Sequence, residues 1–273
     1  MLSSRRPSFL NRILLPSLVA TSVAVGGAYA LHAPEASAEV QLPGFTQEEA
    51  VGDSDASFEA VPEPDIVDWP IPYDEERARL TSAYLAHRTG IKPSGDVWTD
   101  ATIVPRVVVI HHTAGPSAES AWNTFAPVAD RRPGLKDYQK LNLSTHFIVD
   151  RDGTIYRLHD ETLAGRHTIG LNHLSIGIEN VGGIDGYELT DAQVEANIEL
   201  IRYLKAKYPT ITHAIGHHEY RAFEHHPYFE ERDPNYRTVK IDPGEEFMAE
   251  VRAGLDSLAI AGPPGEGELA QVR

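Results

Sequence analysis

Cysteine is absent from the 273 residues of this chain. The chain therefore forms no disulfide bond and offers no thiolate ligand to a metal ion. The same absence excludes a lipoprotein anchor, which is attached to a cysteine at the cleavage site. It does not exclude export, because an exported protein can fold without disulfides.

Positive charge is scarce in the chain. It has 24 lysines and arginines against 40 aspartates and glutamates, which gives a formal net charge of -16. Nucleic acids bind to basic surfaces, so this balance argues against nucleic acid as a partner. The length, with a hydrophobic content of 41%, suits one domain of ordinary size with room for a leader and a linker.

The N-terminus has the three parts of a secretory signal. Arginines precede an apolar run at residues 13–31, and A-x-A sequences end at Ala30 and Ala38. We predict a signal peptide at residues 1–38 that is cleaved after Ala38, with Ala30 as the second choice. An uncleaved signal anchor is a further alternative, because the run is almost long enough to span a bilayer.

Composition divides the remainder of the chain. Residues 39–66 are acidic, rich in alanine and proline, and without a hydrophobic period, which predicts a flexible linker. We expect the folded domain at residues 67–260 and a disordered tail at residues 261–273, which are rich in glycine and proline. After signal cleavage we expect a monomer without stable membrane insertion.

Strands and helices are mixed along the predicted domain. Buried strands are predicted at 106–112, 174–181 and 211–215, a hairpin at 145–158, and helices from near Asp74, at 190–207 and at 245–258. This mixture predicts an α/β fold, with a single domain built on a central mixed β-sheet flanked by helices.

Three separated side chains are of the type that binds metal ions. His111 ends one predicted strand, His217 follows another, and Asp242 stands in the sequence VKIDPG. Two imidazoles and one carboxylate would hold zinc with one coordination position open for water, which is typical of hydrolases. Each residue alone has a simpler interpretation, as a polar group at a sheet end or in a turn. The sequence also leaves open which histidine of each HH pair faces the metal.

Two charged residues near this set are candidates for catalysis. Glu179 lies in an otherwise apolar strand, where a carboxylate either pairs with a cation or has a raised pKa and acts as a general base. Lys240 stands two residues before Asp242, so an extended segment would place both side chains on the same side. Its ammonium group could stabilise an oxyanion, or it could be an ordinary surface charge.

Other histidines are assigned no role. His213 is four residues before His217, a spacing that would suit a metal pair on a helix, but the surrounding residues predict a strand. His225 and His226 lie in a segment rich in aromatic and charged residues. We expect both of them to be exposed to solvent.

Five motifs follow one another along the chain: VVVIHHTAG, STHFIVDRDGTIYRL, NHLSIGIENVGG, IGHHEY and VKIDPGEEF. Together they resemble the type 2 N-acetylmuramoyl-L-alanine amidases, which are zinc enzymes related to phage lysozyme-type amidases and to peptidoglycan recognition proteins. The resemblance covers roughly residues 104–247. It implies the amidase-like fold of that family, and that His111, His217 and Asp242 hold one zinc ion. It also implies that Glu179 is the general base and that Lys240, which matches the family's KxD lysine, helps to stabilise the oxyanion.

The resemblance distinguishes two branches of the family. Phage-type relatives have a catalytic tyrosine directly before the HF dipeptide, where this chain has Thr145. The glutamate in SIGIE instead matches the branch that acts on anhydro-muramoyl substrates. His167 matches an active-site histidine of the phage-type branch, and Asn172 occupies a position that often lines the same cleft, so both are implied to bind substrate. The segment 219–239 is much longer than in compact relatives.

These features lead to an expected function. We expect an exported zinc amidase, periplasmic or extracellular, that cuts the amide between N-acetylmuramic acid and L-alanine in peptidoglycan or its fragments. The alternative is a peptidoglycan-binding module of the same fold without catalysis. A zinc hydrolase of another amide is the third possibility.

Overall fold

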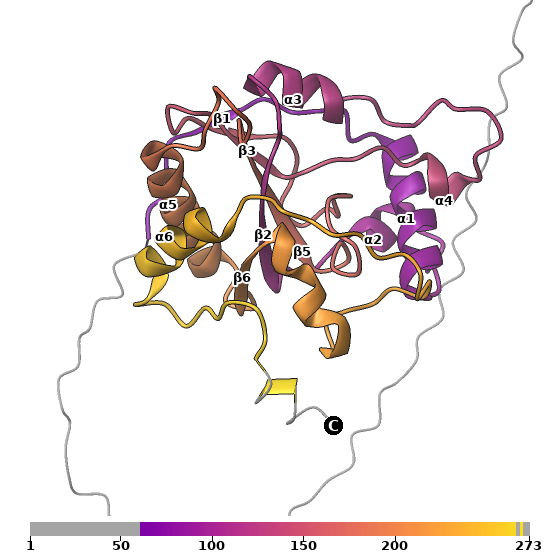
Figure 1. Ribbon diagram of the computed structural model, residues 1–273. Helices are drawn as coiled ribbons and strands as arrows, with labels where there is room; N and C mark the ends of the chain where they lie inside the picture. The colour runs from indigo at the N-terminus through magenta and orange to yellow at the C-terminus, as the bar shows by residue number, and fades with distance from the viewer. Residues whose placement is uncertain (1–60, 266–267, 270–273) are drawn as a thin grey trace, which may run out of the picture. The chain divides into compact units, whose positions relative to one another are not determined.

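The computed structural model describes residues 61–265 and 268–269 (Figure 1). The predicted signal peptide and the predicted linker up to residue 60 lie outside the described residues. The first strand begins at Ile66, one residue before the position at which we expected the domain to start. At the other end, the backbone of Ala261 accepts a hydrogen bond of 2.9 Å from the amide of Ala214, within the segment for which the sequence predicted disorder.

Strands and helices are interspersed along the described residues. The strands are β1 (Ile66–Asp68), β2 (Val107–His112), β3 (Phe147–Val149), β4 (Ile155–Arg157), β5 (Ser175–Asn180) and β6 (His213–Gly216). The helices are α1 (Glu75–Thr89), α2 (Val97–Ala101), α3 (Ala118–Phe125), α4 (Asp137–Lys140), α5 (Asp191–Lys207), α6 (Glu245–Leu255) and the 3₁₀ helix η1 (His217–His225). The sequence predicted β2 to β6, α1, α5 and α6. It did not predict β1 or the short helices α2, α3, α4 and η1.

One six-stranded sheet runs through the domain in the order β1-β4-β3-β5-β2-β6. Only β3 and β4 pair antiparallel, as the predicted hairpin, and the remaining neighbours are parallel. The sheet is therefore mixed, and the predicted α/β fold class is confirmed. Because β5, β2 and β6 are parallel neighbours, their carboxyl ends meet at one edge of the sheet.

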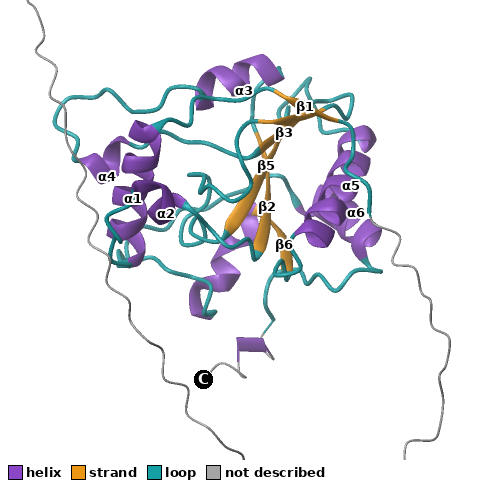
Figure 2. Ribbon diagram, turned by 180° about the vertical axis from the view of Figure 1, so that it is seen from behind, coloured by secondary structure: helices purple, strands orange, loops and turns teal. Residues whose placement is uncertain are grey.

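Helices cover both faces of the sheet. In Figures 1 and 2, α5 and α6 lie on one side of β2, and α1 and α2 lie on the other. Val108 and Ile110 of β2 pack in the cluster that contains α5 and α6, whereas Val107 and Val109 pack in a second cluster with Tyr220 of η1. Side chains alternate between the two faces of a strand, so the odd-numbered residues of β2 lie on one face of the sheet and the even-numbered residues on the other.

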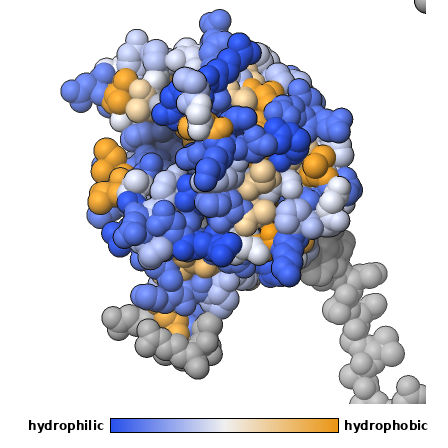
Figure 3. Space-filling view, turned by 90° about the vertical axis from the view of Figure 1, so that its right-hand side faces the viewer, coloured by the Kyte–Doolittle hydropathy of each residue, from blue (hydrophilic) through white to orange (hydrophobic). Residues whose placement is uncertain are grey.

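The surface is mainly polar. Figure 3 shows one side of the molecule, where hydrophilic residues dominate and apolar residues form small separate groups. None of the helices in the described part of the chain has both the length and the apolar character needed to cross a bilayer.

Candidate metal centre

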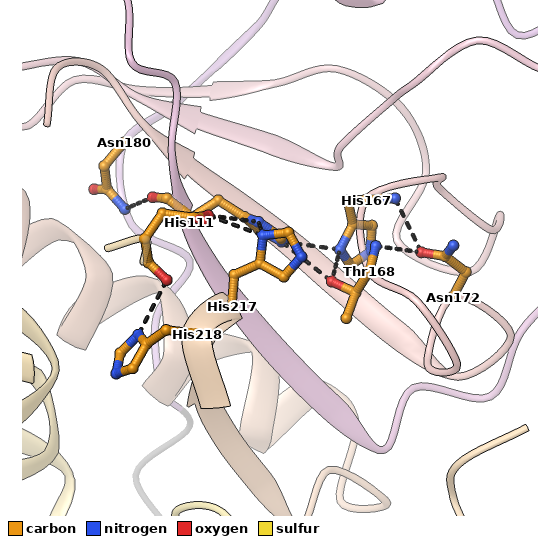
Figure 4. A network of polar contacts seen from close by, with 8 residues as sticks. His111, His167, Thr168, Asn172, Asn180, His217 and His218 are labelled. Atoms are coloured by element: carbon orange, nitrogen blue, oxygen red, sulfur yellow. Dashed lines mark hydrogen bonds and ion pairs between the residues drawn. The ribbon is translucent and has the colours of Figure 1, made fainter. Parts of the chain in front are cut away.

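Three ligand-type atoms converge at the edge where β2 and β6 end. The Nδ1 atoms of His111 and His217 lie 2.9 Å apart (Figure 4). Asp242 Oδ2 lies 2.9 Å from His217 Nδ1 and 3.3 Å from His111 Nδ1. The structure thus brings together the three residues that the sequence proposed as metal ligands.

The local geometry suits a small divalent ion. Zinc ligands at about 2.0–2.1 Å in a tetrahedral arrangement lie roughly 3.3 Å from one another, which is close to the separations found here. The ring nitrogen of His217 that faces the other two residues is Nδ1, and its other nitrogen, Nε2, is buried without a hydrogen-bond partner. Two nitrogens and one oxygen form a donor set that zinc accepts well.

The charge states also suit metal binding. Burial, reinforced by the neighbouring His217, lowers the pKa of His111 to about 4, and burial lowers the pKa of His217 as well. Burial alone would raise the pKa of Asp242, but hydrogen bonds from His111 and His217 outweigh it and hold that pKa well below its usual range. Neutral imidazoles and an ionised carboxylate are the forms in which these groups bind a divalent metal.

The backbone decides which histidine of each pair faces the centre. His111 is two and four residues from Val109 and Val107, and therefore shares their face of β2, whereas His112 points to the opposite face. His218 turns away from the centre. Its backbone amide and its Nδ1 lie 2.9 Å and 3.0 Å from the carbonyl oxygen of Asp242, so His218 fixes the loop that carries this aspartate (Figure 4).

A polar network supports His111 from the other side. His111 Nε2 lies 3.1 Å from His167 Nδ1 and 3.4 Å from Thr168 Oγ1. Asn172 Oδ1 accepts hydrogen bonds from the backbone amides of His167 and Thr168, and its Nδ2 donates to the hydroxyl of Tyr84. Asn172 therefore positions the loop that holds His167 against the metal ligand (Figure 4).

Glycine provides the space that the His167 ring occupies. A Cβ atom at Gly177 of β5 would lie 2.9 Å from His167 Cγ and 2.7 Å from Thr145 Oγ1. Both distances are too short for real contacts. Thr145, which stands where phage-type relatives have a tyrosine, is fully buried against this position.

Glu179 lies beside the three ligand-type residues. It is opposite His111 in the parallel pairing of β5 with β2, so both side chains extend to the same face. Its Oε2 atom is buried without a hydrogen-bond partner. Burial, with a smaller contribution from the negative charge of Asp242, raises the pKa of Glu179 to about 8, although Lys240 acts in the opposite direction.

Two hollows are lined by residues that neighbour the candidate site in the sequence or in space. The one beside the ligands has a volume of about 120 Å³ and is lined by residues that include His167, Asn172, His217 and Lys240. A larger hollow of about 680 Å³ is lined by His112 and by carboxylates at the start of α5 and α6. Of the candidate site residues, His167, Asn172, His217 and Lys240 line the smaller hollow, whereas none of them lines the larger one.

The sequence did not identify four supporting residues: His218, Thr168, Tyr84 and Asn180. Asn180 Nδ2 donates a hydrogen bond to the carbonyl oxygen of His111. Their roles depend on contacts between segments that are distant in sequence, and no local pattern indicates them. The expectation for His226 was wrong: it is only 8% exposed, because aromatic rings of its own segment enclose it. His225 is exposed, as expected.

Comparison with known proteins gives the family. Over 97 residues the chain is 39% identical to the endolysin of Escherichia phage T7, an alignment that covers 34% of this chain and 64% of the endolysin. It is 30% identical to mouse peptidoglycan recognition protein 3 over 103 residues, which are 37% of this chain and 30% of that protein. The chain thus spans less than two thirds of the T7 endolysin.

A solved structure with limited similarity covers most of this chain. N-acetylmuramoyl-L-alanine amidase LysC from Clostridium intestinale URNW has 22% sequence identity and a TM-score of 0.44, with coverage of 71% of this chain and 99% of LysC. Residues 99–245, more than half of the 273 residues, match the family described as N-acetylmuramoyl-L-alanine amidase. The chain belongs to the N-acetylmuramoyl-L-alanine amidase family.

Proposed function

We propose that this chain is an exported, zinc-dependent N-acetylmuramoyl-L-alanine amidase. Its substrate is the amide between the lactyl group of N-acetylmuramic acid and the L-alanine of the peptide stem, in peptidoglycan or in its fragments. One observation carries the proposal: Glu179, whose Oε2 is buried without a hydrogen-bond partner, lies beside three converging metal-type residues, His111, His217 and Asp242.

Zinc is the ion that best fits the proposed site, since the three ligands supply two nitrogens and one oxygen and leave a coordination position open. When bound there, zinc would supply a Lewis acid that polarises the scissile carbonyl and makes water more acidic. His167 and Thr168 hold the imidazole of His111 in the orientation that this role requires.

Glu179 is the proton carrier in this proposal. It takes a proton from the attacking water and delivers it to the leaving amine of L-alanine. A carboxyl group suits both steps when its pKa lies near the working pH, and burial moves the pKa of Glu179 in that direction. Lys240, which lines the smaller hollow with His217, places a positive charge where the tetrahedral oxyanion develops.

Export and oligomeric state complete the proposal. The sequence of residues 1–38, with its arginines, apolar run and A-x-A ends, supports export to the periplasm or beyond, where peptidoglycan is found. We propose a monomer, because the ligands and the proton carrier all come from one chain.

The reaction is tested by mass analysis of the products released from purified peptidoglycan, with and without a chelator. We expect stem peptides with a free L-alanine amino group, released only when zinc is present. Protein that binds peptidoglycan without releasing peptides would support the non-catalytic binding module instead. Cleavage of unrelated acyl-amino acids, with none of peptidoglycan, would indicate a different amide substrate.

The metal ligands are tested with a matched pair of variants, Asp242→Ala and His218→Ala. Each enzyme is stripped with a chelator, and the zinc concentration that restores half of its own maximal activity is measured. Even loss of a supporting partner typically weakens metal affinity by about 10–100-fold, so Asp242→Ala should need at least tenfold more zinc. His218→Ala removes only the side-chain contact to the Asp242 carbonyl and keeps the backbone amide bond, so it should need less additional zinc than Asp242→Ala. If His218→Ala needed more zinc than Asp242→Ala, His218 and not His217 would be the residue that binds the metal.

The proton carrier is tested by Glu179→Gln. The amide has nearly the shape of the carboxylate but cannot accept a proton, so turnover should fall by roughly 10²–10⁴-fold or more. Zinc content, measured on the same preparation, should equal that of the wild type. Turnover close to the wild-type value would remove Glu179 from the mechanism.

The burial of Glu179 also predicts a dependence of stability on pH in the metal-free protein. Its pKa rises from 4.5 in the unfolded chain to about 8 in the fold, so the ionised form destabilises the fold increasingly as the pH rises between these values. Metal-free Glu179→Gln should therefore melt several degrees above the wild type at pH 8, since about 1 kcal/mol shifts Tm by roughly 2–4 °C in such a domain.

Below pH 4.5 this difference should disappear, because Glu179 is then protonated in both the folded and the unfolded chain. The exposed Glu195 of α5 provides the control. Glu195→Gln should have the same melting temperature as the wild type at pH 8 and below pH 4.5. Equal melting of Glu179→Gln and the wild type at pH 8 would show that the carboxylate is not desolvated.

A further inference from the structure

A second group of metal-type side chains lies away from the proposed active site. His213 is the first residue of β6, His226 directly follows η1, and Glu268 belongs to the C-terminal segment. Glu268 Oε1 lies 3.3 Å from His213 Nε2 and 3.4 Å from His226 Nε2. One oxygen atom and two imidazole nitrogens thus meet, the nitrogens from either end of the β6–η1 segment and the oxygen from a part of the chain distant in sequence.

The two histidines are buried but incompletely bonded. His213 is 4% exposed and His226 is 8% exposed. Nε2 of His213 is buried and has no hydrogen-bond partner, although a buried polar atom without a partner normally destabilises a fold. This nitrogen faces Glu268, so its free lone pair points into the space between His213, His226 and Glu268.

The distances favour a shared ion over direct ion pairs. Charge-assisted hydrogen bonds between nitrogen and a carboxylate are about 2.7–2.9 Å long, and both contacts here are clearly longer. They match the separation of roughly 3.3 Å between neighbouring ligands of a tetrahedral zinc ion. Two imidazoles and one carboxylate also form the same donor set as the first centre.

The surroundings hold the imidazoles in place. His213 Nδ1 lies 2.8 Å from Thr212 Oγ1, a second contact of the kind that orients metal-binding histidines. The rings of Phe223 and Tyr228 pack edge-on against His226, with centroid distances of 5.2 Å and 4.5 Å. Few rotamers are therefore open to either histidine, and little side-chain entropy remains to be lost on binding an ion.

One contact works against the ion. The backbone amide of Tyr228 donates a hydrogen bond of 3.2 Å to His226 Nδ1. Coordination through Nε2 places the imidazole proton on Nδ1, so this bond has to open when a metal binds. We therefore expect the second group to bind zinc more weakly than His111, His217 and Asp242 do.

The second group is separate from the first. His213 and His217 stand at opposite ends of β6, and four residues of strand place their Cα atoms on the order of 13 Å apart. His213 also pairs through its backbone with Ala261, which brings the C-terminal segment alongside β6 before it reaches Glu268. An ion at this second position would contact three segments that no disulfide connects.

From these contacts we propose that His213, His226 and Glu268 form a second, structural zinc site. The ion fastens the C-terminal segment and the end of η1 to the start of β6. It stabilises the base of the segment 219–239, which leads onward to Lys240 and Asp242, and takes no part in the reaction itself. This site does not depend on the proposed amidase activity.

Zinc stoichiometry tests the proposal directly. The whole chain is stripped of metal, dialysed against a known free zinc concentration and measured by mass spectrometry of the metal per mole of protein. The wild type should bind two equivalents. His226→Ala and Glu268→Gln should each bind one, and so should His111→Ala, which retains only the second site. The exposed neighbour His225 is the matched control, and His225→Ala should bind two.

Thermal melting in the His111→Ala background isolates the second site. Zinc should raise the melting temperature of His111→Ala, because an ion bound only to the fold stabilises it. It should leave the melting temperature of the double variant His111→Ala/Glu268→Gln unchanged. Glu268→Gln lies outside the reaction centre and is half-buried, so it should fold and should cleave peptidoglycan like the wild type if the proposed function is correct.

Two results would overturn the second site. One is a single zinc equivalent in the wild type across free zinc concentrations up to saturation. The other is two equivalents in both His226→Ala and Glu268→Gln. Failure of the amidase proposal would give a different result. If the wild type bound two equivalents of zinc but released no peptide from peptidoglycan, the proposal of a second zinc site would stand and the proposal of amidase activity would fall.

Discussion

The parallel pairing of β2 with β5 and β6 is the constraint on which the proposed centre depends. This pairing sets His111 opposite Glu179 and brings the end of β2 beside the end of β6, after which His217 follows at once. A shift of β5 by one residue would turn Glu179 to the face of α5 and α6. The hydrogen bonds of the sheet therefore place one ligand and the proposed proton carrier together, and no loop is needed to do so.

The remaining ligand is held differently. Asp242 lies in a loop before α6, and its position depends on the two bonds that His218 makes to its carbonyl oxygen. In the proposed centre, two ligands would come from the ends of strands and one from a loop, so the loop could adjust to an ion without distorting the sheet. One of the carboxylate oxygens of Glu179, Oε2, is buried without a hydrogen-bond partner. Such an arrangement costs stability and is typical of functional groups.

Much of this arrangement could be predicted from local patterns. The β-branched run before His111 and the isolated glutamate among apolar residues identified the strands and the buried acid, because side-chain alternation is a local property. The choice between His111 and His112 required the observed packing of Val107 and Val109. The approach of His226 to Glu268 could not be predicted, because residues more than forty positions apart meet only when the C-terminal segment returns to β6.

The absence of a side chain at Gly177 has an evolutionary consequence. The volume that a methyl group would need there is already taken by the rings and hydroxyls of His167 and Thr145. A mutation at position 177 is therefore acceptable only in a chain whose residue 145 or 167 has already become smaller or moved. These three positions form an epistatic set, in which the order of substitutions matters, and descendants of this sequence should carry them together or exchange them together.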